Sequence, residues 1–101
     1  MLKKKNLKSK SQCKVTFRLN KSYVGIADSV NLVGDMNNWD MESYPMKKLK
    51  NGDFTLDLHL DNDREYQFRY HVNHNYWIND EAADKYISSP FPGVDNSVLI
   101  T

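Results

Sequence analysis

Three segments of the sequence alternate strictly between apolar and polar side chains. Their apolar members lie two residues apart, at Cys13, Val15, Phe17 and Leu19, at Phe54, Leu56, Leu58 and Leu60, and at Tyr66, Phe68, Tyr70 and Val72. Because successive side chains of a β-strand point to opposite faces of a sheet, this pattern predicts three half-buried strands. With no helix of comparable length indicated, the pattern favours an all-β fold, an antiparallel β-sandwich.

Turn signals separate these strands. Asn51-Gly52 is a strong hairpin signal because both residues tolerate positive φ, so residues 46–49 are predicted to pair with residues 53–60. The polar turn at residues 61–63 is predicted to continue into the next strand and complete a three-stranded meander. Shorter elements are expected elsewhere: strands at 30–34 and 97–101, and a single helical turn within 79–85.

Length and composition suit one globular domain. The chain has 101 residues with 40% hydrophobic content, which is enough for one modest core. No apolar stretch approaches the roughly 20 residues of a membrane span, and no signal-peptide core follows the basic start, so we expect a cytoplasmic protein without a membrane partner. The single cysteine, Cys13, is expected to pack in the core, which fits a reducing compartment.

Lysines are concentrated at the start of the chain. Residues 1–10 contain five lysines and no acidic residue, so residues 11–101 hold nine basic and thirteen acidic residues, a net charge of −4. The sequence predicts a disordered basic tail over residues 1–11, with a phosphate-binding arm as the alternative, and a folded module over 12–101. Because nucleic-acid binding normally needs a basic face on the fold itself, no nucleic-acid partner is expected.

Two tryptophans lie beside polar turns. Trp39 ends the turn in VGDMNNWD, and Trp77 follows the turn Asn73-His74-Asn75. With the apolar side chains of residues 66–72 turned inwards, Arg69 faces solvent, and Trp77 is expected on the same face between an inward pair, Tyr76 and Ile78. A single tryptophan in a β-sandwich is more often a core residue. Two of them beside amides and a guanidinium suit a sugar, whose C–H faces stack on aromatic rings.

Four runs carry a family resemblance: VNLVGDMNNWD, PMKKLKNGDFTLDL, YQFRYHVNHNYWINDEAADKY and PFPGVDNSVLI. In this order they resemble the glycogen- and starch-binding modules of carbohydrate-binding module family 48. These are early-set, immunoglobulin-like β-sandwiches found in isoamylases, branching enzymes and the β subunit of AMP-activated protein kinase. The resemblance covers residues 12–101.

The resemblance implies binding of α-1,4-linked glucans, namely glycogen, starch and malto-oligosaccharides. It implies that Trp39 and Trp77 stack on successive glucose rings, and that Arg69 and Asn96 hydrogen-bond to sugar hydroxyls. The loop from Arg69 to Trp77 is one residue longer than in the kinase subunit, and His74 stands where glycine is usual. The resemblance implies no role in sugar binding for residues 91–94.

The sequence also bears on two other classes of function, an enzyme and a protein-docking domain. Glycoside hydrolysis needs two carboxylates about 5–10 Å apart across a sugar, usually in a deep cleft, so we expect no catalytic residues in a module of this size. His59, His71 and His74 lack the spacing of a metal site, and no metal or cofactor is expected. The second hypothesis is a protein-docking domain of the same fold that associates with a glycogen-metabolising enzyme through its exposed aromatic side chains.

Overall fold

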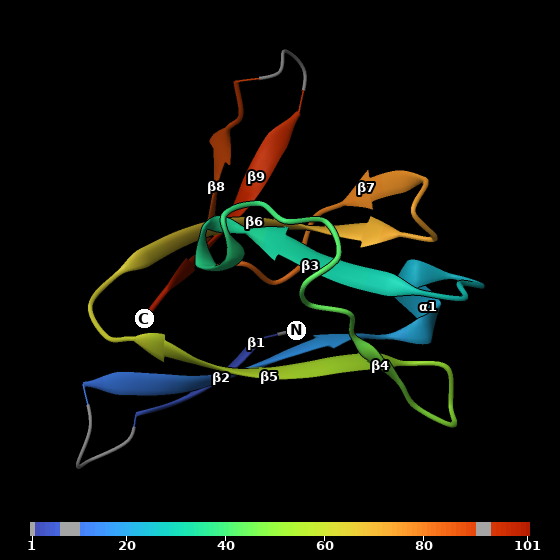
Figure 1. Cartoon of the computed structure of the whole chain (residues 1–101), viewed down its shortest axis with the longest axis horizontal. Helices are drawn as coiled ribbons and strands as arrows, with labels where there is room; N and C mark the ends of the chain where they lie inside the picture. Colours follow the sequence, from blue (N-terminus) through green and yellow to red (C-terminus); the bar gives the residue numbers. More distant parts are fainter. Residues whose placement is uncertain (1, 7–10, 91–93) are drawn as a thin grey trace.

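The computed structural model describes residues 2–6, 11–90 and 94–101, which form two antiparallel β-sheets packed face to face (Figure 1). The first sheet has the order β1, β2, β5, β4, with bounds Leu2–Asn6, Gln12–Leu19, Phe54–Asp61 and Lys47–Lys48. The second has the order β3, β6, β9, β8, with bounds Val30–Gly34, Glu65–Val72, Asp95–Ile100 and Lys85–Ser88. Strand β7 (Tyr76–Ile78) also pairs with β6, and two short helical segments, α1 (Lys21–Val24) and η1 (Asp35–Asn37), lie in the connections. The predicted all-β, immunoglobulin-like sandwich is confirmed.

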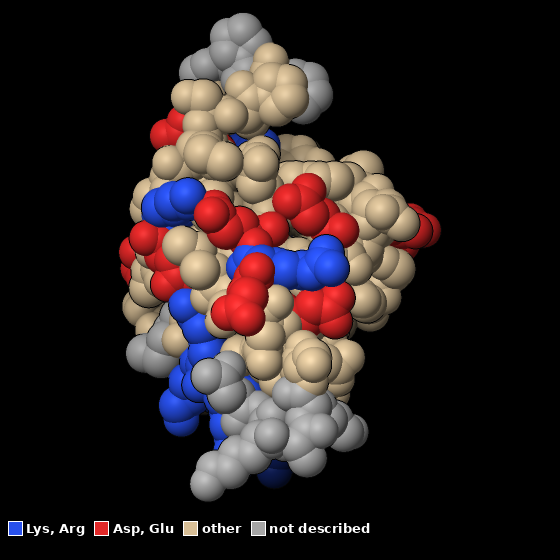
Figure 2. Space-filling view, turned by 90° about the vertical axis from the view of Figure 1, so that its left-hand side faces the viewer, with Lys and Arg blue, Asp and Glu red and all other residues tan. Residues whose placement is uncertain are grey.

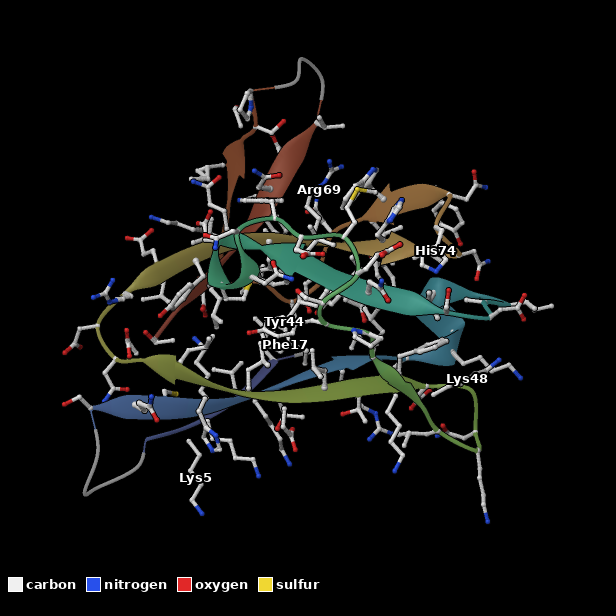
Figure 3. The ribbon with its side chains drawn as sticks, in the orientation of Figure 1. Lys5, Phe17, Tyr44, Lys48, Arg69 and His74 are labelled. Atoms are coloured by element: carbon white, nitrogen blue, oxygen red, sulfur yellow. The ribbon has the colours of Figure 1, made fainter. Side chains whose placement is uncertain are left out.

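The core lies between the sheets and follows the predicted alternation. Along β2 every second side chain from Cys13 to Leu19 is buried, and β5 pairs with β2 along its whole length. Phe17 of the first sheet points into the space between the sheets (Figure 3). Its ring meets that of Phe68 from the second sheet edge to face, with centroids 5.4 Å apart. Fully burying one such side chain stabilises the fold by about 1.5–3 kcal/mol, so these layers hold the two sheets together.

The hairpin at Asn51-Gly52 forms as predicted, but the meander does not. Lys47 and Lys48 of β4 pair with the start of β5, and Gly52 in the turn has a φ of 93°. Strand β6 belongs to the other sheet, so residues 62–64 carry the chain across the sandwich. Two amphipathic strands can bury their apolar faces side by side or face to face, and a turn signal does not distinguish these arrangements.

The segment after β7 also differs from its prediction. Residues 79–85 contain no helix; a turn at residues 81 and 82 leads instead into β8, which pairs antiparallel with β9. Asn79 Oδ1 accepts hydrogen bonds from the Ser97 amide (3.1 Å) and the Ser97 hydroxyl (2.8 Å). These contacts tie the segment to β9, so its polar side chains serve the neighbouring strand in place of a helical turn.

The lysine-rich start is not a disordered tail over residues 2–6, where the prediction is wrong. These residues form β1, which pairs with β2 from Leu2 opposite Phe17 to Asn6 opposite Cys13; residues 7–10 of the predicted tail lie outside the described residues. Lys4 shares the inward side with Val15, and its Nζ lies 2.6 Å from Asp84 Oδ2 and 2.9 Å from the Ile100 carbonyl oxygen. One of the five lysines that argued against order is thus paired, and its contacts link the two sheets.

Deleting residues 1–6 is expected to lower the melting temperature by about 5 °C or more. The deletion removes an edge strand, the packing of Leu2 on the core and the Lys4–Asp84 ion pair. A loss of about 1 kcal/mol corresponds to about 4–8 °C for a domain of this size. Thermal unfolding followed by circular dichroism measures the shift. Lys4→Ala should reproduce part of it, whereas Lys5→Ala, an equal change of charge on an exposed side chain, should leave it nearly unchanged; equal effects would contradict the role of the ion pair.

Charges of both signs cover the surface at one end of the sandwich. Figure 2 shows acidic and basic side chains interspersed there, with further basic side chains gathered below them. Salt bridges among the described residues include Lys85 Nζ to Glu65 Oε1 at 2.7 Å and Arg64 Nε to Asp61 Oδ2 at 3.7 Å.

None of the helices in the described residues is both long enough and apolar enough to cross a membrane.

Candidate functional site: an aromatic groove

The outward face of the second sheet carries a groove of about 610 Å³. Phe68 and Tyr70 of β6 point into the core, so Gln67 and Arg69 of the same strand point away from it, as Figure 3 shows for Arg69. The groove is lined by Asp35, Trp39, Gln67, Arg69, Trp77, Ser89, Pro90, Val94 and Asn96. All four residues singled out in the sequence, Trp39, Arg69, Trp77 and Asn96, therefore lie together, although they come from three strands and a loop.

The two asparagines before Trp39 build the turn that presents it. The Asn37 side chain accepts a hydrogen bond from the Gly34 amide (3.0 Å) and donates to the Leu32 and Asp40 carbonyl oxygens (3.2 and 3.0 Å). Asn38 takes a left-handed conformation with a φ of 56°, which asparagine tolerates better than most residues. One asparagine thus closes the loop and the other reverses the chain.

Gly34 is required by the close approach of this turn to β6. A Cβ atom on residue 34 would lie 2.5 Å from the Gln67 carbonyl oxygen and 2.6 Å from Phe68 Cβ. Distances this short are not tolerated, and both partners belong to a strand of the sheet. Any larger residue would push the turn, and Trp39 with it, away from the groove.

The Trp39 ring is about one-third exposed, at 37%, and is bonded through its nitrogen. The indole Nε1–H donates to Asp35 Oδ1 at 2.9 Å, and Asp35 Oδ2 accepts the backbone N–H of Gln67 at 2.8 Å. The backbone of Trp39 has a φ of 59°, an uncommon value for a bulky residue, and its N–H donates to the Gly34 carbonyl oxygen at 2.8 Å. The ring is thus held out at the groove and is not part of the core.

Trp77 has a different support. It lies opposite His71 in the pairing of β7 with β6, and the two rings stack with centroids 4.2 Å apart at 21°. The guanidinium carbon of Arg69 lies 5.7 Å from the Trp77 ring centroid, within cation–π range, so Trp77 shares the face of Arg69 as predicted. Ile78 packs against the core. Tyr76 lies opposite the buried Val72, on the inward side of the sheet as predicted, but it is 41% exposed and is not buried in the core.

His71 lies against Trp77 in an environment that favours its uncharged form. Its side chain lies beneath Trp77 with 6% of its surface exposed, and the His74 ring lies 6.3 Å away. Burial lowers the pKa of His71 because it disfavours the charged form, and the nearby His74 lowers this pKa further. Imidazole therefore serves here as a flat support for Trp77, a role that the sequence pattern did not reveal.

Polar residues of β6 and β9 line the groove together with the two tryptophans, and we call these residues, Gln67, Arg69 and Asn96, the floor of the groove. Asn96 Nδ2 donates to Gln67 Oε1 at 3.1 Å, and Asn96 itself is only 5% exposed. Within the described residues, Arg69 Nε is buried without a hydrogen-bond partner. Flat apolar rings flanking a small set of donors and acceptors suit a ligand with apolar faces and polar edges.

The strand that carries Asn96 is anchored by Asn79 and by the backbone of Asp80. Asp80 is fully buried; its Oδ2 accepts the Tyr70 hydroxyl at 2.6 Å, and its N–H donates to Ser97 Oγ at 2.9 Å. Asn79 Nδ2 donates to the Asp95 carbonyl oxygen at 2.9 Å. The segment that follows Trp77 is thus fastened to β9 on both sides of Asn96.

Stability is expected to fall as pH rises above about 10, partly through Tyr70. Burial raises the pKa of the Tyr70 hydroxyl well above its ordinary value, and the charge of Asp80 raises it further. The unfolded chain releases this proton near pH 10 while the folded protein keeps it, so this group favours unfolding by up to about 1.4 kcal/mol per pH unit above that point. Urea unfolding between pH 8 and 11.5 tests this. The slope should be shallower in Tyr70→Phe, and equal slopes would contradict the assignment.

Several groove residues were not singled out in the sequence. Gln67 could have been found, because it lies two residues before Arg69 and therefore shares the outward face of β6. Asp35 stands in the turn before Trp39, and its bond to Gln67, 32 residues away, has no local signal. Ser89, Pro90 and Val94 carry no local signal, since the pairing of β8 with β9 brings them to the groove. No group of three or more potential metal ligands occurs in the parts of the chain that the structure describes.

The fold and the groove together define a β-sandwich module with an open, aromatic surface site. Residues 7–91 match the family described as carbohydrate-binding module 48 (isoamylase N-terminal domain). Because the match covers most of the 101 residues, the chain belongs to this family and is a carbohydrate-binding module, as the resemblance indicated. Three of the four predicted site residues lie within the matched range, and Asn96 lies beyond it. A comparison with curated proteins found no match.

Proposed function

We propose that this module binds α-1,4-linked glucans, such as glycogen, starch and malto-oligosaccharides, without catalysing their cleavage. The observation that carries the proposal is the placement of Trp39 and Trp77, each 37% exposed, in the lining of one groove. Membership of the family supports carbohydrate binding in general. Two aromatic platforms beside one polar floor provide stacking surfaces for two sugar rings of a chain.

The polar residues of the floor match the needs of sugar hydroxyls. Arg69 lines the groove with a guanidinium group, which carries only hydrogen-bond donors, and the Asn96–Gln67 pair offers both donors and acceptors. A hydroxyl group can donate one hydrogen bond and accept two, so it can complete such a set. In this proposal, stacking supplies most of the affinity and the floor selects the orientation of the sugar.

The same groove gives little basis for hydrolysis. Asp35 is the one carboxylate in its described lining, and its two oxygens accept hydrogen bonds from Trp39 and Gln67. Glycoside cleavage by the usual route needs a pair of carboxyl groups about 5–10 Å apart across the bond that breaks. We therefore infer a binding role and no enzymatic one.

Retention on insoluble amylopectin tests the proposal. The protein should be retained and should be released by maltoheptaose, while cello-oligosaccharides of equal length, whose β-linkages give a different chain shape, should release far less. Equal release by both sugars would contradict the α-glucan assignment. Absence of retention, together with specific recovery of a glycogen-metabolising enzyme from lysate, would instead favour the docking-domain alternative.

A further inference from the structure

We propose that Asp35 is a positioning residue that sets the orientation of the Trp39 ring for sugar stacking. The proposal rests on the proposed glucan-binding function and adds a determinant of its affinity. One carboxylate oxygen of Asp35 accepts the indole N–H of Trp39 (2.9 Å), and the other accepts the backbone N–H of Gln67 (2.8 Å). A single side chain thus connects the exposed ring to strand β6, whose outward face forms the floor of the groove.

An anchor is needed because the turn itself holds the ring weakly. The backbone of Trp39 lies in the left-handed region, with a φ of 59°, where a bulky residue is disfavoured. Trp39 is 37% exposed, so packing contacts cover only part of its surface. The indole N–H is the only polar group on this side chain, and its bond to a charged acceptor is of the stronger kind.

The two platforms are therefore held in different ways. Trp77 is held by a ring, through stacking on His71 at 4.2 Å, whereas Trp39 is held at its nitrogen by a carboxylate. Stacking on His71 holds the plane of Trp77 against the sheet. A hydrogen bond at one edge of Trp39 fixes the direction in which its face points. Without that bond the ring would take several orientations in the free protein. Sugar binding would then have to order it, which costs affinity.

Asp35→Asn tests the role of the carboxylate with almost no change of shape. An amide has one acceptor oxygen, so it can accept from Gln67 or from Trp39 but not from both in the present geometry. We expect about a tenfold loss of affinity for maltoheptaose in isothermal titration, since bonds to charged groups are about twice as strong as neutral ones. In the protein without sugar, the Trp39 indole ¹H–¹⁵N resonance should move and broaden.

Asp40→Asn is the matched control. Asp40 lies in the same loop, and its Oδ1 accepts the Glu42 N–H at 2.8 Å, a bond that an asparagine oxygen can also accept. This variant makes the same change of charge and should keep both the affinity and the Trp39 resonance. A loss equal to that of Asp35→Asn would show that net charge is responsible, and it would overturn the proposal.

A double-mutant cycle separates positioning from direct contact with the sugar. Trp39→Phe keeps an aromatic ring and removes the N–H, so Asp35→Asn should cost less than about twofold in that background. An undiminished tenfold cost there, or an unchanged Trp39 resonance in Asp35→Asn alone, would overturn the proposal. The resonance is measured without sugar, so it tests positioning even if the unchanged protein fails to bind maltoheptaose, a result that would refute the proposed function itself.

Discussion

Trp39→Ala is expected to weaken maltoheptaose binding by about thirtyfold or more while changing stability by about 1 kcal/mol or less. A central aromatic anchor contributes about 2 kcal/mol or more to binding, which corresponds to this loss of affinity. The ring is over one-third exposed and bonds to Asp35 at the groove, so its removal opens no core cavity. Titration with maltoheptaose measures the loss of affinity, and urea unfolding of the same variant measures the change in stability.

Trp77→Ala should lose a similar factor in affinity but more stability. Its ring covers His71, and removing it exposes an imidazole that is now buried. If Trp39→Ala instead costs about 3–5 kcal/mol of stability, the magnitude typical of a core aromatic, the ring is a structural residue and the stacking role is wrong.

Phe17→Ala also truncates an aromatic side chain, but unlike Trp39→Ala it is expected to cost much stability. Phe17 is fully buried and packs edge to face on Phe68, which in turn packs edge to face on Tyr70 at 5.6 Å. Truncation leaves a cavity in the layer that joins the two sheets, so the free energy of unfolding should fall by about 3–5 kcal/mol. Chemical denaturation measures this loss.

A milder variant keeps the Phe17 prediction testable if the alanine variant does not fold. Phe17→Leu retains most of the volume and should cost about 1.5 kcal/mol or less. Its maltoheptaose affinity should equal that of the unchanged protein, because residue 17 lies in the first sheet, behind the groove. A large loss of affinity in folded Phe17→Leu would contradict the separation of core and site.

Local patterns in the chain were enough to predict the three long strands and three residues that line the groove, Trp39, Arg69 and Trp77. Alternation of apolar and polar residues is imposed by the two faces of a strand, so β2, β5 and β6 could be located from the residues alone. The same rule placed Arg69 and Trp77 on one outward face, and the Asn37-Asn38 turn indicated that Trp39 is held at the surface. Each of these inferences depends on contacts within a few residues of sequence.

Only the tertiary structure decided which strands and side chains that are far apart in the sequence contact one another. The apolar face of a strand requires a cover without specifying which element provides it, so β5 and β6 came to lie in opposite sheets, and β1 formed where a tail was expected. The carboxylate of Asp35 is tied to strand β6 by the backbone N–H of Gln67, 32 residues away. His71 becomes a support for Trp77 only when β7 folds back on β6. Such contacts depend on which surfaces the packed sheets bring together, and no local pattern encodes that choice.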